Sequence, residues 1–98
     1  MAKYHLTKKA VEDLTEIWNY TYEEWSETQA DAYYFLLLNS CQALADNPKR
    51  GKKYDIVIEN LLGYKSNQHI IFYLILSKSE IEIVRILHGS MDLKSKFE

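Results

Sequence analysis

The spacing of hydrophobic residues changes along the chain, and each change marks a predicted element. Residues 3–6 alternate weakly between apolar and polar positions, which indicates a short strand. From residue 8 the apolar positions recur three and four residues apart, the period of one face of an amphipathic helix. This period predicts a helix over about residues 8–25. Its apolar stripe comprises Val11, Leu14, Trp18, Thr21 and Trp25, widened by Ile17 and Tyr22.

A second helix is expected to follow almost at once. Ser26 and Gln29 have the spacing of a capping box, in which the serine hydroxyl accepts from the amide of the residue three positions on. The helix should start near residue 27 and end before Pro48, because the residue before a proline avoids the α region. So short a connection favours an antiparallel helical hairpin. The predicted stripe of this helix is Ala30, Tyr33 or Tyr34, Leu37, Cys41, Leu44 and Ala45.

After Pro48 the pattern becomes that of a sheet. A polar loop over residues 49–53, with its turn at Gly51, precedes runs that alternate or are rich in β-branched residues. The last two runs, joined by a short polar turn, predict an antiparallel hairpin at the sheet centre. The predicted strands are residues 54–59, 61–65, 69–76 and 81–87, followed by a short terminal helix within residues 91–97. The order β-α-α-β-β-β-β predicts an α+β fold, an antiparallel sheet with the N-terminal α-helical hairpin packed on one face.

Composition narrows the class of protein. A chain of 98 residues has room for a single domain over residues 1–98, and 47% hydrophobic with 27% charged residues is typical of a folded globular protein. The densest apolar run, residues 70–76, is far shorter than the ~20 residues of a membrane span, and no signal peptide is recognisable at the start. One cysteine, Cys41, excludes an internal disulfide and suits a reducing compartment. We therefore expect a cytoplasmic protein with no membrane partner.

The two halves of the chain differ in charge. Residues 1–48 hold three lysines and eight acidic residues, a balance of −5, whereas residues 49–98 hold nine basic and six acidic residues, a balance of +3. This asymmetry predicts two faces with different partners. The basic excess is too small to indicate nucleic-acid binding by itself.

Enzyme motifs for phosphate, dinucleotide or zinc chemistry are absent from the sequence. Cys41 lies on an apolar stripe, which favours a buried structural thiol. His69 and His88 lie on strands expected to pair, but two imidazoles fall short of a catalytic zinc site, so neither metal nor cofactor is expected. Acid–base cleavage of RNA remains open, because Lys65, Arg85 and His88 could supply a cation, a base and an acid.

Aromatic residues are the broadest functional signal in the composition. Eight tyrosines and two tryptophans are more than one small core can bury. Tyrosine and tryptophan combine a large contact area with a polar group, and they are enriched at protein interfaces. The sequence therefore predicts a surface that contacts another protein.

A series of motifs resembles the ParE branch of the RelE/ParE superfamily, the toxins of type II toxin–antitoxin pairs. Three segments carry the resemblance in the family's order and spacing. They are the D-L-x-x-I-W-x-Y-T series of residues 13–21, H-I-I-F-Y of residues 69–73, and V-R-I-L-H-x-x-M-D of residues 84–92. Trp25, Gln29-Ala30, Leu44-Ala45, Pro48 and Gly51 extend it over nearly the whole chain.

The resemblance implies a β-α-α-β-β-β(-β) fold and a cognate ParD-like antitoxin in a hetero-oligomer, with operator DNA contacted only through that antitoxin. It implies that the chain inhibits DNA gyrase by binding it and is not an enzyme. The expected antitoxin contacts on the helical hairpin are Trp18, Tyr22, Trp25 and Tyr33. The expected target contacts are Lys65, Arg85, His88, Met91 and Phe97.

Two alternatives stay open beside this interpretation. One is a RelE-like ribosome-dependent mRNA interferase that would use Lys65, Arg85 and His88. The other is a degenerate, non-toxic module that still binds an antitoxin. The second alternative arises because Ser90 stands where many relatives carry an arginine, and Lys65 is the one cation in residues 62–67.

Overall fold

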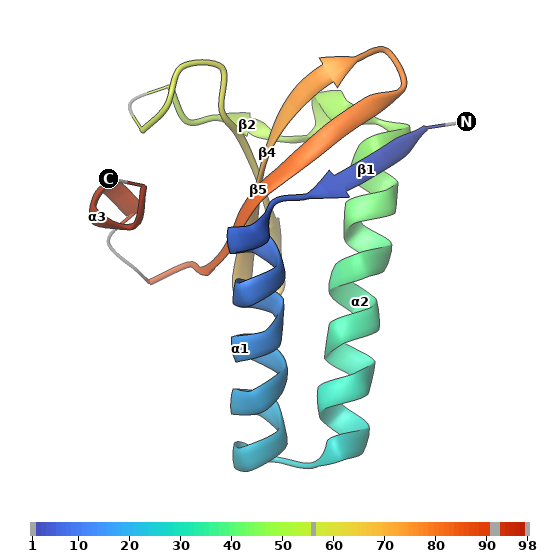
Figure 1. The fold of residues 1–98 in the computed structure, drawn as a ribbon, viewed down its shortest axis with the longest axis vertical. Helices are drawn as coiled ribbons and strands as arrows, with labels where there is room; N and C mark the ends of the chain where they lie inside the picture. The colour runs from blue at the N-terminus through green and yellow to red at the C-terminus, as the bar shows by residue number, and fades with distance from the viewer. Residues whose placement is uncertain (1, 56, 91–92, 98) are drawn as a thin grey trace.

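The helical hairpin predicted from the sequence packs on one face of a five-stranded sheet (Figure 1). The computed structural model describes residues 2–55, 57–90 and 93–97. The sheet order is β1-β5-β4-β3-β2, and the α+β class is confirmed. The elements are β1 Lys3–Leu6, α1 Lys8–Glu24, α2 Glu27–Asp46, the 3-10 turn η1 Pro48–Arg50, β2 Lys52–Lys53, β3 Leu62–Ser66, β4 His69–Ser77, β5 Glu80–His88 and α3 Leu93–Lys96.

The sheet is mixed, where the sequence predicted an antiparallel one. β1 pairs with β5 in parallel, with Tyr4 opposite Ile81, whereas the pairs β2–β3, β3–β4 and β4–β5 are antiparallel. A parallel pair needs a long connection that crosses over the sheet. The helical hairpin is part of the connection between β1 and β5, so β5 can lie beside β1 and run in the same direction.

Side-chain caps fix where both long helices begin. Thr7 Oγ1 accepts from the Ala10 backbone N–H at 3.0 Å and donates to the Val84 carbonyl at 2.7 Å, so the α1 cap also anchors this helix on β5. Ser26 Oγ accepts from the Gln29 backbone N–H at 3.1 Å, as the capping box predicted. Each cap satisfies a backbone donor that has no partner inside the helix.

The strand predicted over residues 54–59 is wrong. The short strand β2 forms earlier, with Lys52 opposite Gly63, and the chain then turns. The Tyr54 carbonyl accepts from the N–H of Val57 at 2.9 Å and of Ile58 at 3.3 Å. Tyr54, Val57 and Ile58 of this segment are half-buried against the sheet face away from the helices, so these side chains contribute to packing and not to strand pairing.

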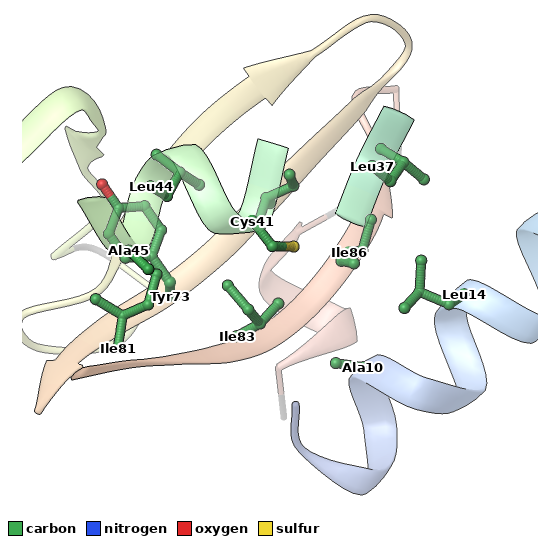
Figure 2. Packing of buried hydrophobic residues seen from close by; sticks show 11 residues of the cluster. Ala10, Leu14, Leu37, Cys41, Leu44, Ala45, Tyr73, Ile81, Ile83 and Ile86 are labelled. Carbon is green, nitrogen blue, oxygen red and sulfur yellow. The ribbon is translucent and has the colours of Figure 1, made fainter. Parts of the chain in front are cut away.

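Two cores lie on opposite faces of the sheet. The helix-side core is large and includes Leu37, Cys41 and Leu44 of α2 against Tyr73, Ile83 and Ile86 of the central strands (Figure 2). Burial raises the pKa of the Cys41 thiol to about 12, which agrees with a structural role for this residue. The outer core is smaller, and its buried members are Leu61, Phe72 and Leu87. Its half-buried members are Tyr54, Val57, Ile58, Ile70, Leu74, Val84, Leu93 and Phe97.

Neither long helix in the described part of the chain combines the length and hydropathy of a membrane span.

Candidate functional site

The helical hairpin extends beyond the end of the sheet (Figure 1). Large apolar side chains of this overhang are exposed, among them Tyr20, Trp25 and Leu36. α1 contributes Ala10, Leu14 and Ile17 to the helix-side core. Past Ile17 the helix no longer packs in that core, and Trp25 at its end is 72% exposed. The predicted apolar stripe is wrong at Val11, which is 48% exposed, because α1 faces the sheet with the row that contains Ala10 and Leu14.

An open pocket of about 880 Å³ lies beneath the overhang, which we call the overhang pocket. Its walls come from the second half of α1 and the first half of α2, and its floor comes from the ends of β4 and β5. The lining residues are Asp13, Glu16, Ile17, Tyr20, Thr21, Trp25, Gln29, Ala32, Tyr33, Leu36, Gln68, His69, Arg85, Ile86, Leu87, His88 and Lys96. A concave, mainly apolar surface with a few polar groups is the usual form of a binding site.

The four aromatic residues predicted for partner contact divide into two pairs. Trp25 and Tyr33 line the overhang pocket. Trp18 and Tyr22 lie outside its lining and stack on each other along α1, with ring centroids 5.3 Å apart and planes 7° apart. The indole N–H of Trp18 donates to Asp31 of α2 at 2.9 Å, which ties the two helices together.

Polar side chains follow the pocket floor where β4 meets β5. His69 and His88 are cross-strand partners, as predicted, and their ring centroids are 5.4 Å apart. The Tyr33 hydroxyl lies 2.6 Å from His69 Nδ1, and Ser90 Oγ lies 2.7 Å from His88 Nδ1. Desolvation by burial, followed by the influence of His88, lowers the pKa of His69 to about 4.

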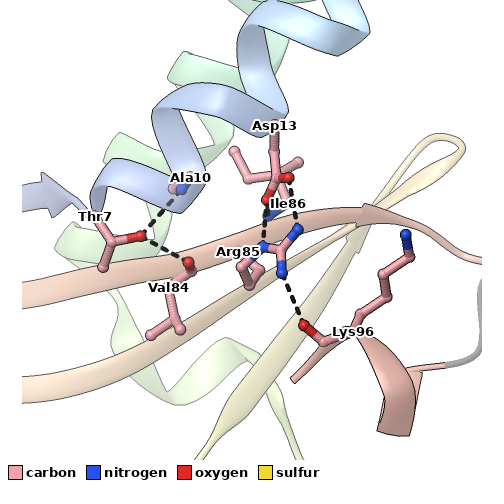
Figure 3. A network of polar contacts seen from close by, with 7 residues as sticks. All are labelled: Thr7, Ala10, Asp13, Val84, Arg85, Ile86 and Lys96. Atoms are coloured by element: carbon pink, nitrogen blue, oxygen red, sulfur yellow. Dashed lines mark hydrogen bonds and ion pairs between the residues drawn. The ribbon is translucent and has the colours of Figure 1, made fainter. Parts of the chain in front are cut away.

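A buried ion pair joins α1, β5 and α3 at the edge of the pocket (Figure 3). Arg85 donates from Nε and Nη2 to the two carboxylate oxygens of Asp13, each at 2.8 Å, and from Nη1 to the Lys96 carbonyl at 2.8 Å. Asp13 also accepts from the Ile86 backbone N–H at 3.0 Å. The hydrogen bonds with Asp13 raise the pKa of Arg85.

A β-bulge in β5 places these groups. Phe72 pairs with Arg85 but Tyr73 pairs with Ile83, so Val84 is an extra residue with no partner of its own. Such a bulge changes the direction of a side chain and frees backbone groups from the ladder. The freed Val84 carbonyl accepts from Thr7, and the Ile86 N–H donates to Asp13. The sequence analysis did not select Asp13 as a site residue. The signal that could have found it is its position three residues after Ala10, which puts a carboxylate on the buried face of α1.

Comparison with known proteins places this fold in a family. Residues 4–93 match the family model described as ParE toxin of type II toxin-antitoxin system, parDE. The chain belongs to the ParE toxin family. It is 32% identical over 92 residues to Toxin ParE1 of Mycobacterium tuberculosis, with 94% of each chain covered, and 33% identical over 99 aligned positions to Toxin ParE1 of Caulobacter vibrioides, with 97% of each covered.

A solved structure described as the chromosomal ParDE TA system from P. aeruginosa shares the fold of this ParE-family chain. The TM-score is 0.76 at 17% identity, with 90% of this chain and 96% of the other covered. The fold and family expected from the motif series are therefore confirmed.

The residues proposed for RNA cleavage are not gathered at one place in this ParE-family chain. Arg85 and His88 line the overhang pocket, whereas Lys65 is absent from its lining. Lys65 pairs with Ile70, a member of the outer core, and paired residues of an antiparallel ladder point to the same face. Lys65 therefore lies on the face opposite His88.

Phe97, one of the two C-terminal residues predicted for target contact, packs against the outer core. The Phe97 ring packs edge-on against Phe72, with centroids 5.2 Å apart and planes 81° apart. Met91 lies outside the described residues. The short helix expected at this end is α3, and Arg85 holds it through the Lys96 carbonyl.

Proposed function

We propose that this ParE-family chain is a toxin that acts by binding and is neutralised by a ParD-like antitoxin seated in the overhang pocket. The observation that carries the proposal is the set of exposed aromatic and aliphatic side chains around the pocket, in a chain of this family. Apolar side chains gathered on one concave surface mark a binding site for another molecule.

The shape of the overhang pocket suits an amphipathic helix. Such a helix binds by placing the apolar residues of one face into a hydrophobic groove. Tyr20 of α1 and Trp25 at its end line the pocket together with Leu36 of α2, and all three are exposed in the free chain. The related structure, described as a ParDE system, supports an antitoxin of the ParD kind as the partner.

We propose DNA gyrase as the target and the cytoplasm as the place of action, as the resemblance implied. Of the five expected target contacts, Lys65, His88, Met91 and Phe97 stay proposed contacts. Two features favour binding over bond cleavage. Lys65 and His88 lie on opposite faces of the sheet, and the Cys41 thiol is buried with a raised pKa. Arg85 uses three nitrogen atoms for contacts within the chain, so we propose that it positions the C-terminal segment for the target.

The proposal is tested by inducing the chain in a bacterial host with and without the antitoxin encoded in the neighbouring reading frame. We expect growth to stop with filamentation and an SOS response when the chain is alone, and to recover when the antitoxin is present. Purified chain should also inhibit supercoiling by DNA gyrase. Normal supercoiling with excess chain would reject gyrase as the target, and cleaved transcripts would favour the mRNA interferase. Normal growth with retained antitoxin binding would favour the non-toxic module.

The antitoxin site has a matched pair of variants. Trp25→Ala removes a pocket residue, and Phe35→Ala removes an aromatic residue that is also exposed but lies outside the lining. We expect Trp25→Ala to weaken antitoxin binding about thirtyfold, because truncating a central aromatic anchor costs about 2 kcal/mol, and Phe35→Ala to leave it unchanged. Equal effects of the two variants, measured by calorimetry, would place the antitoxin elsewhere.

A further inference from the structure

Two histidines at the polar end of the overhang pocket have hydrogen-bonding roles fixed by their neighbours. His69 begins β4 and His88 ends its antiparallel partner β5, and both residues line the pocket. Their planes are tilted by 82° at a centroid distance of 5.4 Å. Which nitrogen of each ring carries the proton decides whether the pair offers donors or acceptors to an incoming molecule.

Tyr33 sets the tautomer of His69. The Tyr33 hydroxyl oxygen lies 2.6 Å from His69 Nδ1, and a phenol is a stronger hydrogen-bond donor than acceptor, so the favoured arrangement has its O–H donating to an unprotonated Nδ1. Burial raises the pKa of Tyr33, so this hydroxyl keeps its proton at neutral pH. The pKa of His69, lowered to about 4, leaves the ring neutral with a single proton. Because Nδ1 accepts from Tyr33, that proton lies on Nε2.

Ser90 sets the tautomer of His88. The Ser90 backbone N–H donates to His88 Nδ1 at 3.2 Å, and a ring nitrogen that accepts from a backbone N–H carries no proton. The proton of His88 therefore also lies on Nε2. Within the described residues, no hydrogen bond involves either Nε2 atom, and no side-chain nitrogen or oxygen is both buried and unpaired. Both Nε2 atoms are therefore accessible to solvent, on two side chains that line the pocket.

We infer that His69 and His88 together bind a carboxylate of the antitoxin through their two Nε2–H groups. This inference rests on the proposed function, since it names what the antitoxin segment must present at this end of the pocket. The formal charges of the acidic and basic lining residues sum to zero, since Asp13 is paired with Arg85 and Glu16 is opposite in sign to Lys96. The two adjacent imidazole donors are therefore the feature to be matched. A carboxylate matches them with two oxygens and charge-assisted hydrogen bonds.

The antitoxin segment then needs two features. One is an apolar anchor that packs between Trp25 and Leu36, and the other is an acidic side chain or a free C-terminal carboxylate that reaches the histidines. The apolar residues and the histidines belong to the same pocket, so one segment can meet both. This pairing would let the pocket discriminate among amphipathic helices that differ only in an acidic position.

The free protein provides the first test. Long-range proton–nitrogen correlation of its histidine rings near neutral pH should show the Nε2–H tautomer for both His69 and His88. An Nδ1–H tautomer on either ring would overturn the inference. Tyr33→Phe should change the ratio of the two tautomers at His69 and leave the tautomer of His88 unchanged, which checks that the tyrosine is the cause.

The second test measures coupling between the histidines and the partner's acids. The affinity of the chain is measured for overlapping synthetic peptides that cover the antitoxin from the neighbouring reading frame. In the peptide that binds most tightly, each Asp or Glu is then replaced in turn by Asn or Gln, and in a further peptide the C-terminus is amidated. One of these changes should weaken binding about tenfold to a hundredfold, the range for a charged hydrogen bond. In His69→Phe and His88→Phe the same change should have little further effect. His69→Gln and His88→Gln, which keep an N–H donor, should retain part of the coupling.

The outcomes separate this inference from the proposed function. Tight peptide binding with no acid coupled to either histidine would overturn the carboxylate site and leave the antitoxin in the pocket. Failure of the full-length antitoxin and of every peptide to bind would overturn the proposed function as well. Melting curves guard against misfolding of His69→Phe, and His88→Phe provides a second variant that leaves the Tyr33 contact intact.

Discussion

The two faces of the sheet are built differently, although neighbouring residues of one strand serve both. Tyr73 of β4 is buried in the helix-side core, and Phe72 before it is buried in the outer core. The helix-side core receives whole helical faces from α1 and α2, whereas among the described residues the outer core is covered by a turn and the C-terminal segment. Stability should therefore reside mainly on the helix side.

The ends of the helix-side face also differ from each other. Near the start of α1 the face is buried and closely packed, and beyond Ile17 the same two helices leave the overhang pocket open. One hairpin thus holds the fold together at one end and offers a binding surface at the other. Substitutions in the packed end and in the open end, and in the helix-side core and the outer core, should therefore differ in how much unfolding free energy they remove.

The largest effect is expected from Leu44→Ala in the helix-side core. Leu44 is 0% exposed, and deleting a fully buried leucine side chain costs about 4 kcal/mol of unfolding free energy through lost burial and the cavity left behind. Leu36→Ala, on the same helix but in the pocket wall, should change it by less than about 0.5 kcal/mol. Urea unfolding measures both. Similar losses for the two variants would remove the distinction between the packed end and the open end.

The second largest effect is expected from Asp13→Ala. It should lower the unfolding free energy by about 3 kcal/mol, because breaking a buried ion pair leaves Arg85 without its partner. The change also removes the acceptor for the Ile86 backbone N–H. Glu12→Ala, at the exposed neighbouring position, is the matched control and should be nearly neutral. Denaturant unfolding with a loss below about 1 kcal/mol for Asp13→Ala would show that the pair adds little to stability.

Phe97→Ala tests the outer core and should lower the unfolding free energy by about 1.5 kcal/mol. This is less than the loss for a fully buried aromatic side chain, because Phe97 is only half-buried. Lys96→Ala keeps the backbone carbonyl that Arg85 contacts, so it should leave the melting temperature unchanged. If Phe97→Ala abolishes toxicity with no fall in melting temperature, the tail acts in recognition and not in packing.

The smallest effect concerns pH. The pKa of His69 falls from 6.5 to about 4 on folding, so between these values the unfolded chain binds more protons than the folded chain. Its contribution therefore makes unfolding easier as pH falls from about 6.5 toward 4 and is constant above that window. Because the ring is partly solvated, we expect a discounted effect on the order of 1 kcal/mol. The difference between wild type and His69→Gln, in unfolding measured against pH, isolates it, and parallel curves would contradict it.

About half of the candidate site could be predicted from the sequence. Trp25 and Tyr33 were expected at a partner surface and do line the pocket. The strands of His69 and His88 were expected to pair, and the structure makes the two histidines direct cross-strand partners. Tyr20 and Leu36 were missed because both lie off the predicted stripes. Their exposure depends on where the sheet ends beneath the helices, which no local pattern records.

Sequence alone determined the features that depend on near neighbours in the chain. The start of α2 follows from Ser26 and its end from Pro48, because caps and proline act through backbone groups a few residues away. The motif series likewise sufficed to determine the family. Tertiary structure decided the parallel pairing of β1, the turn after Tyr54, the Asp13–Arg85 pair and the overhang pocket. Each of these depends on surfaces supplied by residues far away in the chain, and an apolar or charged side chain is satisfied only when folding brings those surfaces to it.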